Sequence, residues 1–197
     1  MKLFIALIFL PILSFSQNDY LNELIQHRND KNIEYKDTIK SPFKTDQIES
    51  FDSLNYFSPN EKWKVQAIFT KEIGGPFDMA TSAGKKKRFR QYGKLRFIID
   101  GAVYELSIYQ NIQLMTNPLY KDYIFIPFTD LTNGEETYGG GRYIETKTPT
   151  SGVFELDFNY CFNPYCHYTD GYNCPIPPKE NFLNLKIEAG EKVYEKH

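Results

Sequence analysis

The chain has 197 residues, of which 23 are basic and 25 acidic, so its formal net charge is −2 at pH 7. This near-neutral balance argues against a general nucleic-acid binder, which usually shows a strong basic excess. Sixteen Phe and fifteen Tyr give one domain ample material for a core and for the walls of a binding site.

Residues 1–16 have the layout of a secretory signal. Lys2 precedes an apolar run of eleven residues, and small residues follow. We expect cleavage after Ser16, which leaves 17–197 as a single domain. The apolar run is shorter than the roughly 20 residues that a membrane helix needs, and no later segment is apolar enough. The sequence therefore predicts an exported protein, periplasmic or extracellular, without a membrane span.

A helix is expected at the start of the mature chain, from Asn18 to about Lys36. Asn18 or Asp19 can cap it, and the Ser41-Pro42 pair ends it because the residue before proline avoids helical angles. A second, short helical turn is expected near 45–51. The residues that form a narrow stripe on the first helix are Leu21, Leu24, Ile25 and Arg28.

From Trp63 onward the apolar residues recur with a period of two, which is typical of strands. Asp100-Gly101 lies between two such runs and predicts a tight hairpin turn, because both residues tolerate positive φ. With a strand on either side of 85–87, about eight or nine short strands are expected. The pattern predicts a mainly β fold, a meandering barrel or sandwich with an N-terminal helix. The other runs are 95–99, 104–108, 123–128, 142–147, 152–159 and 183–187.

A segment rich in glycine and charge, 130–143, connects two of these strands. Its backbone N–H groups at 139–141 can face an anion, which the two-pronged guanidinium of Arg142 can clamp. It is not a Walker loop, because it lacks the Lys-Ser/Thr pair and precedes a strand. The alternative is a turn in which Arg142 pairs with Glu136 or Asp157 and holds loops together. In the binding interpretation, the site residues are Arg142, Tyr138, Tyr143, Glu136, Asp130, Asp157 and Asn159.

Three classes of function remain open at this point. The first is a protein that holds a small polar or anionic molecule, with no cofactor, no nucleic acid and an undetermined oligomeric state. The second is a hydrolase that uses two of Asp130, Glu136 and Asp157 as acid and base, because carboxylates about 5–9.5 Å apart cleave glycosides. The third is a purely structural envelope protein, in which the same polar cluster only joins loops.

Three cysteines lie within the proline-rich segment 157–178. In an exported protein the first interpretation is a disulfide, and Cys166–Cys174 is the preferred pair because it closes a short loop. Cys161 is then unpaired. A metal site formed by these cysteines and His167 is disfavoured, because the spacing does not resemble a zinc knuckle. A catalytic cysteine with His167 as its base is disfavoured too, since adjacent side chains on an extended chain point to opposite faces.

Eight short motifs spread over the mature chain carry a family resemblance. They are Leu54–Phe57, Tyr92–Phe97, Phe125–Phe128, Glu136–Tyr143, Asp157–Asn159, Asn163–Cys166, Cys174–Pro178 and Ala189–Glu191. Together they resemble the domain of unknown function 1684 family of bacteria and archaea, which has no assigned activity, over about residues 24–191. The resemblance implies that Arg142, Glu136, Asp130 and Asp157 are shared site residues. The chain departs from the family pattern at Cys161 and His167, where small residues are expected, which argues against a catalytic role for either.

Overall fold

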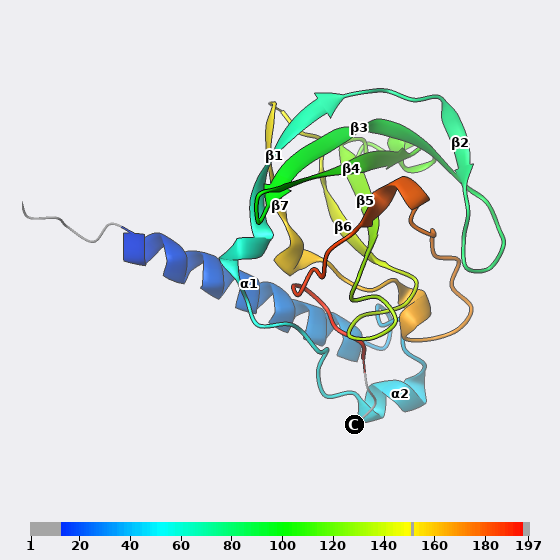
Figure 1. The fold of residues 1–197 in the computed structure, drawn as a ribbon. Coiled ribbons are helices and arrows are strands. Elements are labelled where there is room, and N and C mark those ends of the chain that lie inside the picture. Colours follow the sequence, from blue (N-terminus) through cyan, green and yellow to red (C-terminus); the bar gives the residue numbers. More distant parts are fainter. Residues whose placement is uncertain (1–12, 151, 195–197) are drawn as a thin grey trace, which may run out of the picture.

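The structure, a computed structural model, describes residues 13–150 and 152–194 (Figure 1). It is mainly β: eight strands of the described chain form one curled sheet, a half-barrel, and the N-terminal helix runs beneath it (Figure 1). The predicted fold class is thereby confirmed. Residues 1–12, which hold most of the predicted signal, lie outside the described residues, so the signal and its cleavage site stay predictions.

Most strands lie where the period of two predicts them. The sheet order is β6-β5-β4-β3-β1-β7, with β2 added beside β3 and β8 paired in parallel with β5. The predicted last strand is the exception, since only its first residues pair. The strands are β1 Lys64–Lys71, β2 Pro76–Met79, β3 Lys87–Ile99, β4 Ala102–Asn111, β5 Tyr123–Asp130, β6 Arg142–Lys147, β7 Val153–Asp157 and β8 Phe182–Leu183.

The helical elements are two α-helices and five short 3-10 turns in the described chain. No helix among the described residues is long and apolar enough to cross a membrane. The second helix confirms the turn expected near 45–51. The elements are α1 Leu13–Lys36, α2 Thr45–Ser50, η1 Glu61–Trp63, η2 Leu114–Thr116, η3 Phe158–Tyr160, η4 Tyr165–His167 and η5 Lys179–Asn181.

The inner face of α1 differs from the predicted stripe. Leu21 and Ile25 are 38% and 44% exposed, whereas Leu24 and Tyr35 are buried. The helix also begins at Leu13, so Asn18 and Asp19 lie within it and do not cap it. Polar residues share the inner face with Leu24 and Tyr35 because part of that face borders a cavity. Apolar periodicity alone therefore does not identify the inner face of this helix.

The β3–β4 hairpin has the predicted tight turn, with φ of 50° at Asp100 and 79° at Gly101. Further along, the register of β3 against β4 shifts between Gln91 and Gly93. Such a bulge adds one residue to a strand and so reverses which side chains share a face. This shift separates the side chains of β3 before the bulge from those after it.

Glycine is required at position 93 by close packing. A Cβ there would lie 2.5 Å from Cε2 of Phe69 and 2.5 Å from the carbonyl oxygen of Thr70. The neighbouring Phe69 and Tyr92 rings stack with centroids 5.8 Å apart. The bulge therefore brings two strands together more closely than a side chain at 93 would permit.

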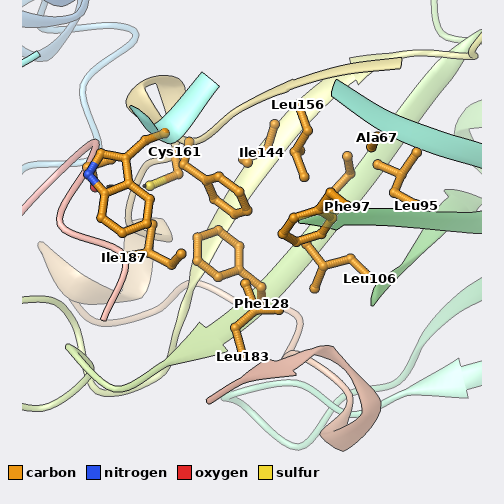
Figure 2. Packing of buried hydrophobic residues seen from close by; sticks show 14 of the residues in the cluster. Ala67, Leu95, Phe97, Leu106, Phe128, Ile144, Leu156, Cys161, Leu183 and Ile187 are labelled. Carbon is orange, nitrogen blue, oxygen red and sulfur yellow. Dashed lines mark hydrogen bonds between the residues drawn. The ribbon is translucent and has the colours of Figure 1, made fainter. Parts of the chain in front are cut away.

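The main hydrophobic cluster draws on seven of the eight strands of the described chain. Figure 2 shows Phe97, Phe128 and Leu106 meeting in it, with Ile144 and Leu156 alongside. A separate cluster comprises Met79, Phe89, Tyr109, Phe125 and Tyr143.

The two clusters lie on opposite faces of β5 and β6. Ile124 and Ile126 belong to the main cluster, which defines the core face. Phe125 lies opposite Glu145 in the register of the two strands and next to Tyr143, on the other face. We call this second face the cavity face. Strands covered on both sides carry continuous apolar runs, which explains the sequence Tyr-Ile-Phe-Ile-Pro-Phe of β5.

Asn181 replaces a missing stretch of backbone pairing between β4 and β5. The two strands pair in register only at Tyr109 and Phe125, and Pro127 has no N–H to offer a ladder. Fully buried Asn181 accepts a hydrogen bond from Ser107 N at 2.8 Å and donates to Ser107 O at 2.8 Å and Pro127 O at 2.7 Å. Its amide thus satisfies three buried backbone groups at once.

Candidate functional site

Arg142 lies on the core face of β6 and has no exposed surface. Its Nη2 donates to Asp130 Oδ2 at 2.8 Å and to Ile187 O at 2.8 Å, and its Nη1 donates to the carbonyl oxygens of Ala189 and Glu191. The guanidinium therefore joins the start of the 130–143 loop to the C-terminal segment. The sequence identified the right arginine, but its carboxylate partner is Asp130 and neither Glu136 nor Asp157.

The carboxylate of Asp130 is fully engaged by the protein. Its Oδ1 accepts hydrogen bonds from Thr132 N at 2.8 Å, Thr132 Oγ1 at 2.6 Å and Ile187 N at 3.3 Å. Both side chains of the Arg142–Asp130 pair are 0% exposed. A pair this well matched and this far from water serves the fold, and neither member lines the cavity described below.

Gly190 shapes the chain that surrounds Arg142. It has a φ of +70°, and a Cβ there would overlap the sulfur and carbonyl oxygen of Cys161. Positive φ at a crowded position is available only to glycine without strain. The turn at 190 lets Ala189 and Glu191, on either side of it, both present their carbonyl oxygens to one guanidinium.

The remaining predicted site residues do not converge on Arg142, although Asp157 Oδ1 accepts hydrogen bonds from Asn159 N at 2.8 Å and Asn159 Nδ2 at 2.9 Å. Glu136 forms an exposed ion pair with Lys186 at 3.0 Å. Tyr138 packs on the ring of His167 with centroids 5.0 Å apart. Asp157 accepts from the Tyr20 hydroxyl at 2.8 Å.

Asn159 exchanges two hydrogen bonds with the backbone of Asn60, at 3.1 and 2.9 Å. Each polar residue thus fastens a different pair of segments. The three carboxylates proposed for a hydrolase, at 130, 136 and 157, have three different partners and give that reaction no support. Of the three glycine N–H groups, that of Gly141 is taken by the carbonyl of Tyr138 at 3.1 Å and does not face an anion.

A cavity of about 560 Å³ lies between α1, the cavity face of β3 to β6, and the loop after η3. Helix α1 contributes His27, Lys31 and Tyr35, and β6 contributes Tyr143 and Glu145. Nine aromatic side chains of the described chain line the cavity together with a few polar groups. This size and composition are typical of small-molecule sites. Of the seven predicted binding residues, Tyr143 alone among the described residues borders it.

Glu145 is a carboxylate of this cavity whose neighbouring hydrogen-bond donor is the Tyr123 hydroxyl. It is solvent-exposed and has no ion pair among the described residues. Surrounding protein raises its pKa above the usual range, while the nearby Tyr123 hydroxyl and the positive charge of Lys31 act in the opposite direction. The pKa of Tyr123 is raised by burial and by the same carboxylate. Water in the cavity therefore hydrates Glu145 less well than open solvent would.

The other carboxylate of the cavity, Glu191, has structural partners. It is 1% exposed and accepts hydrogen bonds from Asn163 N at 2.8 Å, from the Tyr168 hydroxyl and from the Tyr56 hydroxyl at 3.4 Å. Burial raises its pKa, and these hydrogen bonds oppose the shift. Glu191 thus ties Tyr168 and Tyr56 to the C-terminal segment, and its oxygens are engaged by the protein.

Two lysines bring positive charge to the cavity. Lys31 is held by Glu34, one helical turn away, at 2.9 Å. Lys87 has no ion pair among the described residues, and burial lowers its pKa. The cavity therefore holds one cation, Lys87, and one anion, Glu145, that form no ion pair within the described chain.

The loop that closes the cavity is braced by a disulfide. Cys166 and Cys174, the pair that the sequence favours, are bonded, with their Cα atoms 6.3 Å apart. Cys174 and its neighbours Tyr172 and Asn173 line the cavity. The bond therefore fixes one wall of the site.

Cys161 is free and buried, as the preferred pairing implies. Burial raises the pKa of its thiol to about 12, so it is not a nucleophile at neutral pH. His167 accepts a hydrogen bond from Tyr194 N at 2.8 Å, and burial lowers its pKa to about 4. Among residues 13–150 and 152–194, no cluster of His, Cys, Asp or Glu is placed to hold a metal ion.

Sequence reasoning missed the cavity because its aromatic side chains are indistinguishable from core residues. Tyr123, Phe125 and Tyr143 belong to apolar strands, and Glu145 has the appearance of an ordinary surface residue. The signal that was present is the period of two. It places Glu145 on the same face of β6 as Tyr143, which is an unusual position for a carboxylate beside buried rings.

Comparison with known proteins agrees with the fold and gives no activity. A family model described as "Protein of unknown function (DUF1684)" matches residues 49–192. The chain belongs to the domain of unknown function 1684 family. A relative of known structure is an uncharacterised protein of Haloarcula marismortui, solved by solution NMR. It is 29% identical, with a TM-score of 0.70, and the match covers 94% of this chain and 100% of that one. No curated protein matches the chain.

The limits of the family match divide the cavity. Strands β3 to β6, and the loop that holds the disulfide, lie within residues 49–192. Helix α1 precedes that range and supplies a wall of its own. The family match therefore spans the sheet and loop side of the cavity, and the match to the Haloarcula marismortui structure, which covers 94% of this chain, takes in part of α1 as well.

Proposed function

We propose that this member of the domain of unknown function 1684 family binds a small polar molecule in the 560 Å³ cavity. The observation that carries the proposal is Glu145: an ionisable side chain without an ion pair, placed among aromatic rings in a recess that water enters. A carboxylate whose pKa is raised inside a cleft is a recurring mark of functional sites.

The composition of the cavity supports the same proposal. Aromatic rings supply most of the wall, and Lys87, Glu145 and Asn173 supply separated polar groups. Binding sites commonly combine apolar walls with a few directional polar contacts, because the walls provide affinity and the polar groups fix the orientation. The ligand contacts are therefore assigned to these residues and to Tyr143, and no longer to Arg142.

We also propose that binding takes place outside the cytoplasm. Residues 1–16 have the composition of an export signal, and disulfides persist in oxidising compartments. Mass spectrometry of the protein recovered from the periplasm or medium tests this directly. A mature N-terminus at Gln17 supports it, and an intact Met1 in the cytoplasmic fraction contradicts it.

A thermal-shift screen tests the proposed binding. The purified protein is melted with sugars, nucleotides, organic acids and amines, and each hit is repeated on Glu145→Gln. A ligand present at a hundred times its Kd adds about 2.7 kcal/mol to the stability of the folded state. We expect a hit whose shift is lost or reduced in Glu145→Gln.

Glu105→Gln is the matched control for this screen. Glu105 is an exposed glutamate on a strand of the same sheet, paired with Lys94 at 3.2 Å and outside the cavity. The control should keep the full shift. A hit that is equally strong in wild type and in Glu145→Gln would contradict binding in the cavity.

A further inference from the structure

We infer that the ligand is a neutral carbohydrate. This inference rests on the proposed function and deepens it by naming the chemistry that the cavity matches. It is carried by the hydrogen-bonding groups left over inside the cavity after the fold has used the others, and by their balance of charge.

The first of these groups is an acceptor without a donor. Asn173 Oδ1 is buried and has no hydrogen-bond partner among the described residues, and Asn173 lines the cavity. A buried carbonyl oxygen without a partner is expensive, so a ligand that donates to it gains affinity. The Glu145 carboxylate is a second acceptor in the same cavity.

The next two groups are donors. Asn111 uses its Oδ1 for the backbone N–H groups of Gln113 at 2.9 Å and Leu114 at 3.3 Å, and its Nδ2 has no partner in the described chain. Lys87 presents an ammonium group without an ion pair among those residues. A ligand must therefore accept on one side and donate on the other. Hydroxyl groups do both, whereas an ammonium group only donates and a carboxylate only accepts.

The charges of the cavity do not favour an ionic ligand. Lys31 and Lys87 are balanced by Glu145 and Glu191, and Lys31 and Glu191 are already occupied by protein groups. An organic cation would meet Lys87, and an organic anion would meet Glu145, each with repulsion. A neutral ligand meets neither penalty.

The rings of the cavity suit a sugar ring in shape. Tyr165 and Tyr172 lie edge to face with centroids 5.1 Å apart, and Phe125 and Tyr143 do so at 4.7 Å. Tyr165 and Tyr172 are half-buried and give the cavity partly accessible apolar surface, whereas Phe125 and Tyr143 are buried rings that border it. A pyranose has the complementary surface, with C–H groups on its faces and hydroxyl groups around its rim.

Saturation-transfer NMR tests the inference, because it detects weak binding. The protein is titrated with glucose, galactose, N-acetylglucosamine and maltose, and in parallel with choline, spermidine and citrate. We expect saturation transfer to at least one sugar. Glu145→Gln and Asn173→Leu should each weaken that binding about tenfold or more, since the first replaces a charged acceptor by a weaker neutral one and the second leaves a sugar hydroxyl without a partner. Glu105→Gln should leave it unchanged.

The outcomes separate this inference from the proposed function. Binding of the amines or of citrate alone, sensitive to Glu145→Gln, overturns the carbohydrate inference and leaves a ligand-binding cavity. Sugar binding that neither Glu145→Gln nor Asn173→Leu changes also overturns it, because the sugar would then lie elsewhere. No binding by any of the seven compounds counts against both. Circular dichroism melts of the variants exclude loss of folding as the cause.

Discussion

Arg142 and Tyr143 are consecutive residues of β6, and their side chains lie on opposite faces of the sheet. Arg142 reaches Asp130 at 2.8 Å within the core, whereas Tyr143 packs on Phe125 with centroids 4.7 Å apart and borders the cavity. Neighbouring residues of a strand must diverge in this way. Of these two predicted site residues, Tyr143 borders the cavity and Arg142 lies in the core.

The buried arginine should be essential for stability. Arg142→Ala leaves Asp130 as an uncompensated charge and removes the donors to Ile187 and Ala189, so we expect a loss of about 3–5 kcal/mol. Urea denaturation at pH 7 measures it. If Arg142→Ala were as stable as wild type but no longer bound ligand, the structural role would be contradicted and Arg142 would be a binding residue.

Lys186→Ala provides the control for a surface ion pair. Lys186 is 47% exposed and pairs with Glu135 and Glu136 at 3.5 and 3.0 Å. Exposed pairs contribute about 0–1 kcal/mol, so the change should be small. Both variants remove one positive charge. The difference between their losses of stability therefore measures the effect of burying the Arg142–Asp130 pair.

Asn181 should contribute strongly to the free energy of unfolding, because its side chain forms a buried hydrogen-bond network. Asn181→Leu keeps a similar volume but leaves the N–H and carbonyl of Ser107 and the carbonyl of Pro127 without partners. At about 1–3 kcal/mol for each unsatisfied buried group, the loss should exceed about 3 kcal/mol. Urea denaturation detects it, and Asn117→Ala on the surface should stay near wild type. A mild effect of Asn181→Leu would mean that β4 and β5 can re-pair without the amide.

The close approach at Gly93 predicts a destabilising alanine. Gly93→Ala places a Cβ 2.5 Å from a ring carbon of Phe69 and from the backbone oxygen of Thr70, and the backbone cannot move without opening the β1–β3 ladder. Overpacking of this kind costs about 1–3 kcal/mol. A thermal melt should show it. Gly75→Ala, where a Cβ meets nothing within 4 Å, should melt as wild type does.

Stability should fall in mild acid because of His167. Burial lowers its folded pKa to about 4 from an ordinary 6.5, so the unfolded chain takes up the proton first. The contribution is fully present above pH 6.5 and is lost as the pH falls toward 4. We expect His167→Gln to flatten this part of the profile in urea titrations between pH 7 and 4.5. Some slope should remain, because burial also lowers the pKa of His27. Parallel profiles for wild type and variant would contradict the assignment.

Local pattern predicted much of the fold. The period of two located β5 and β6, Asp100-Gly101 set the hairpin, and short loop closure selected Cys166–Cys174. These features depend on neighbours in sequence, which a single chain displays. Prediction of the site required knowing which residues far apart in the sequence come into contact.

Three distant contacts decided the outcome for the site. Several acidic residues could pair with Arg142 by sequence, and only the folded structure shows that its partner is Asp130. Asn181 gives no sign in the sequence that it bridges strands more than 50 residues away. The cavity forms only because α1 packs over the aromatic face of the sheet. In the sequence its lining residues resemble core residues, and only the register of β5 and β6 shows that Glu145 lies among them.

Helix α1 supplies one wall of the cavity by itself. The match to the domain of unknown function 1684 family begins at residue 49, after His27, Lys31 and Tyr35. These three contact positions lie on one helix, so substitutions there can change a cavity wall without altering the strand pairings of the sheet. Exchange of these helix residues should therefore change the proposed ligand preference while the sheet stays folded.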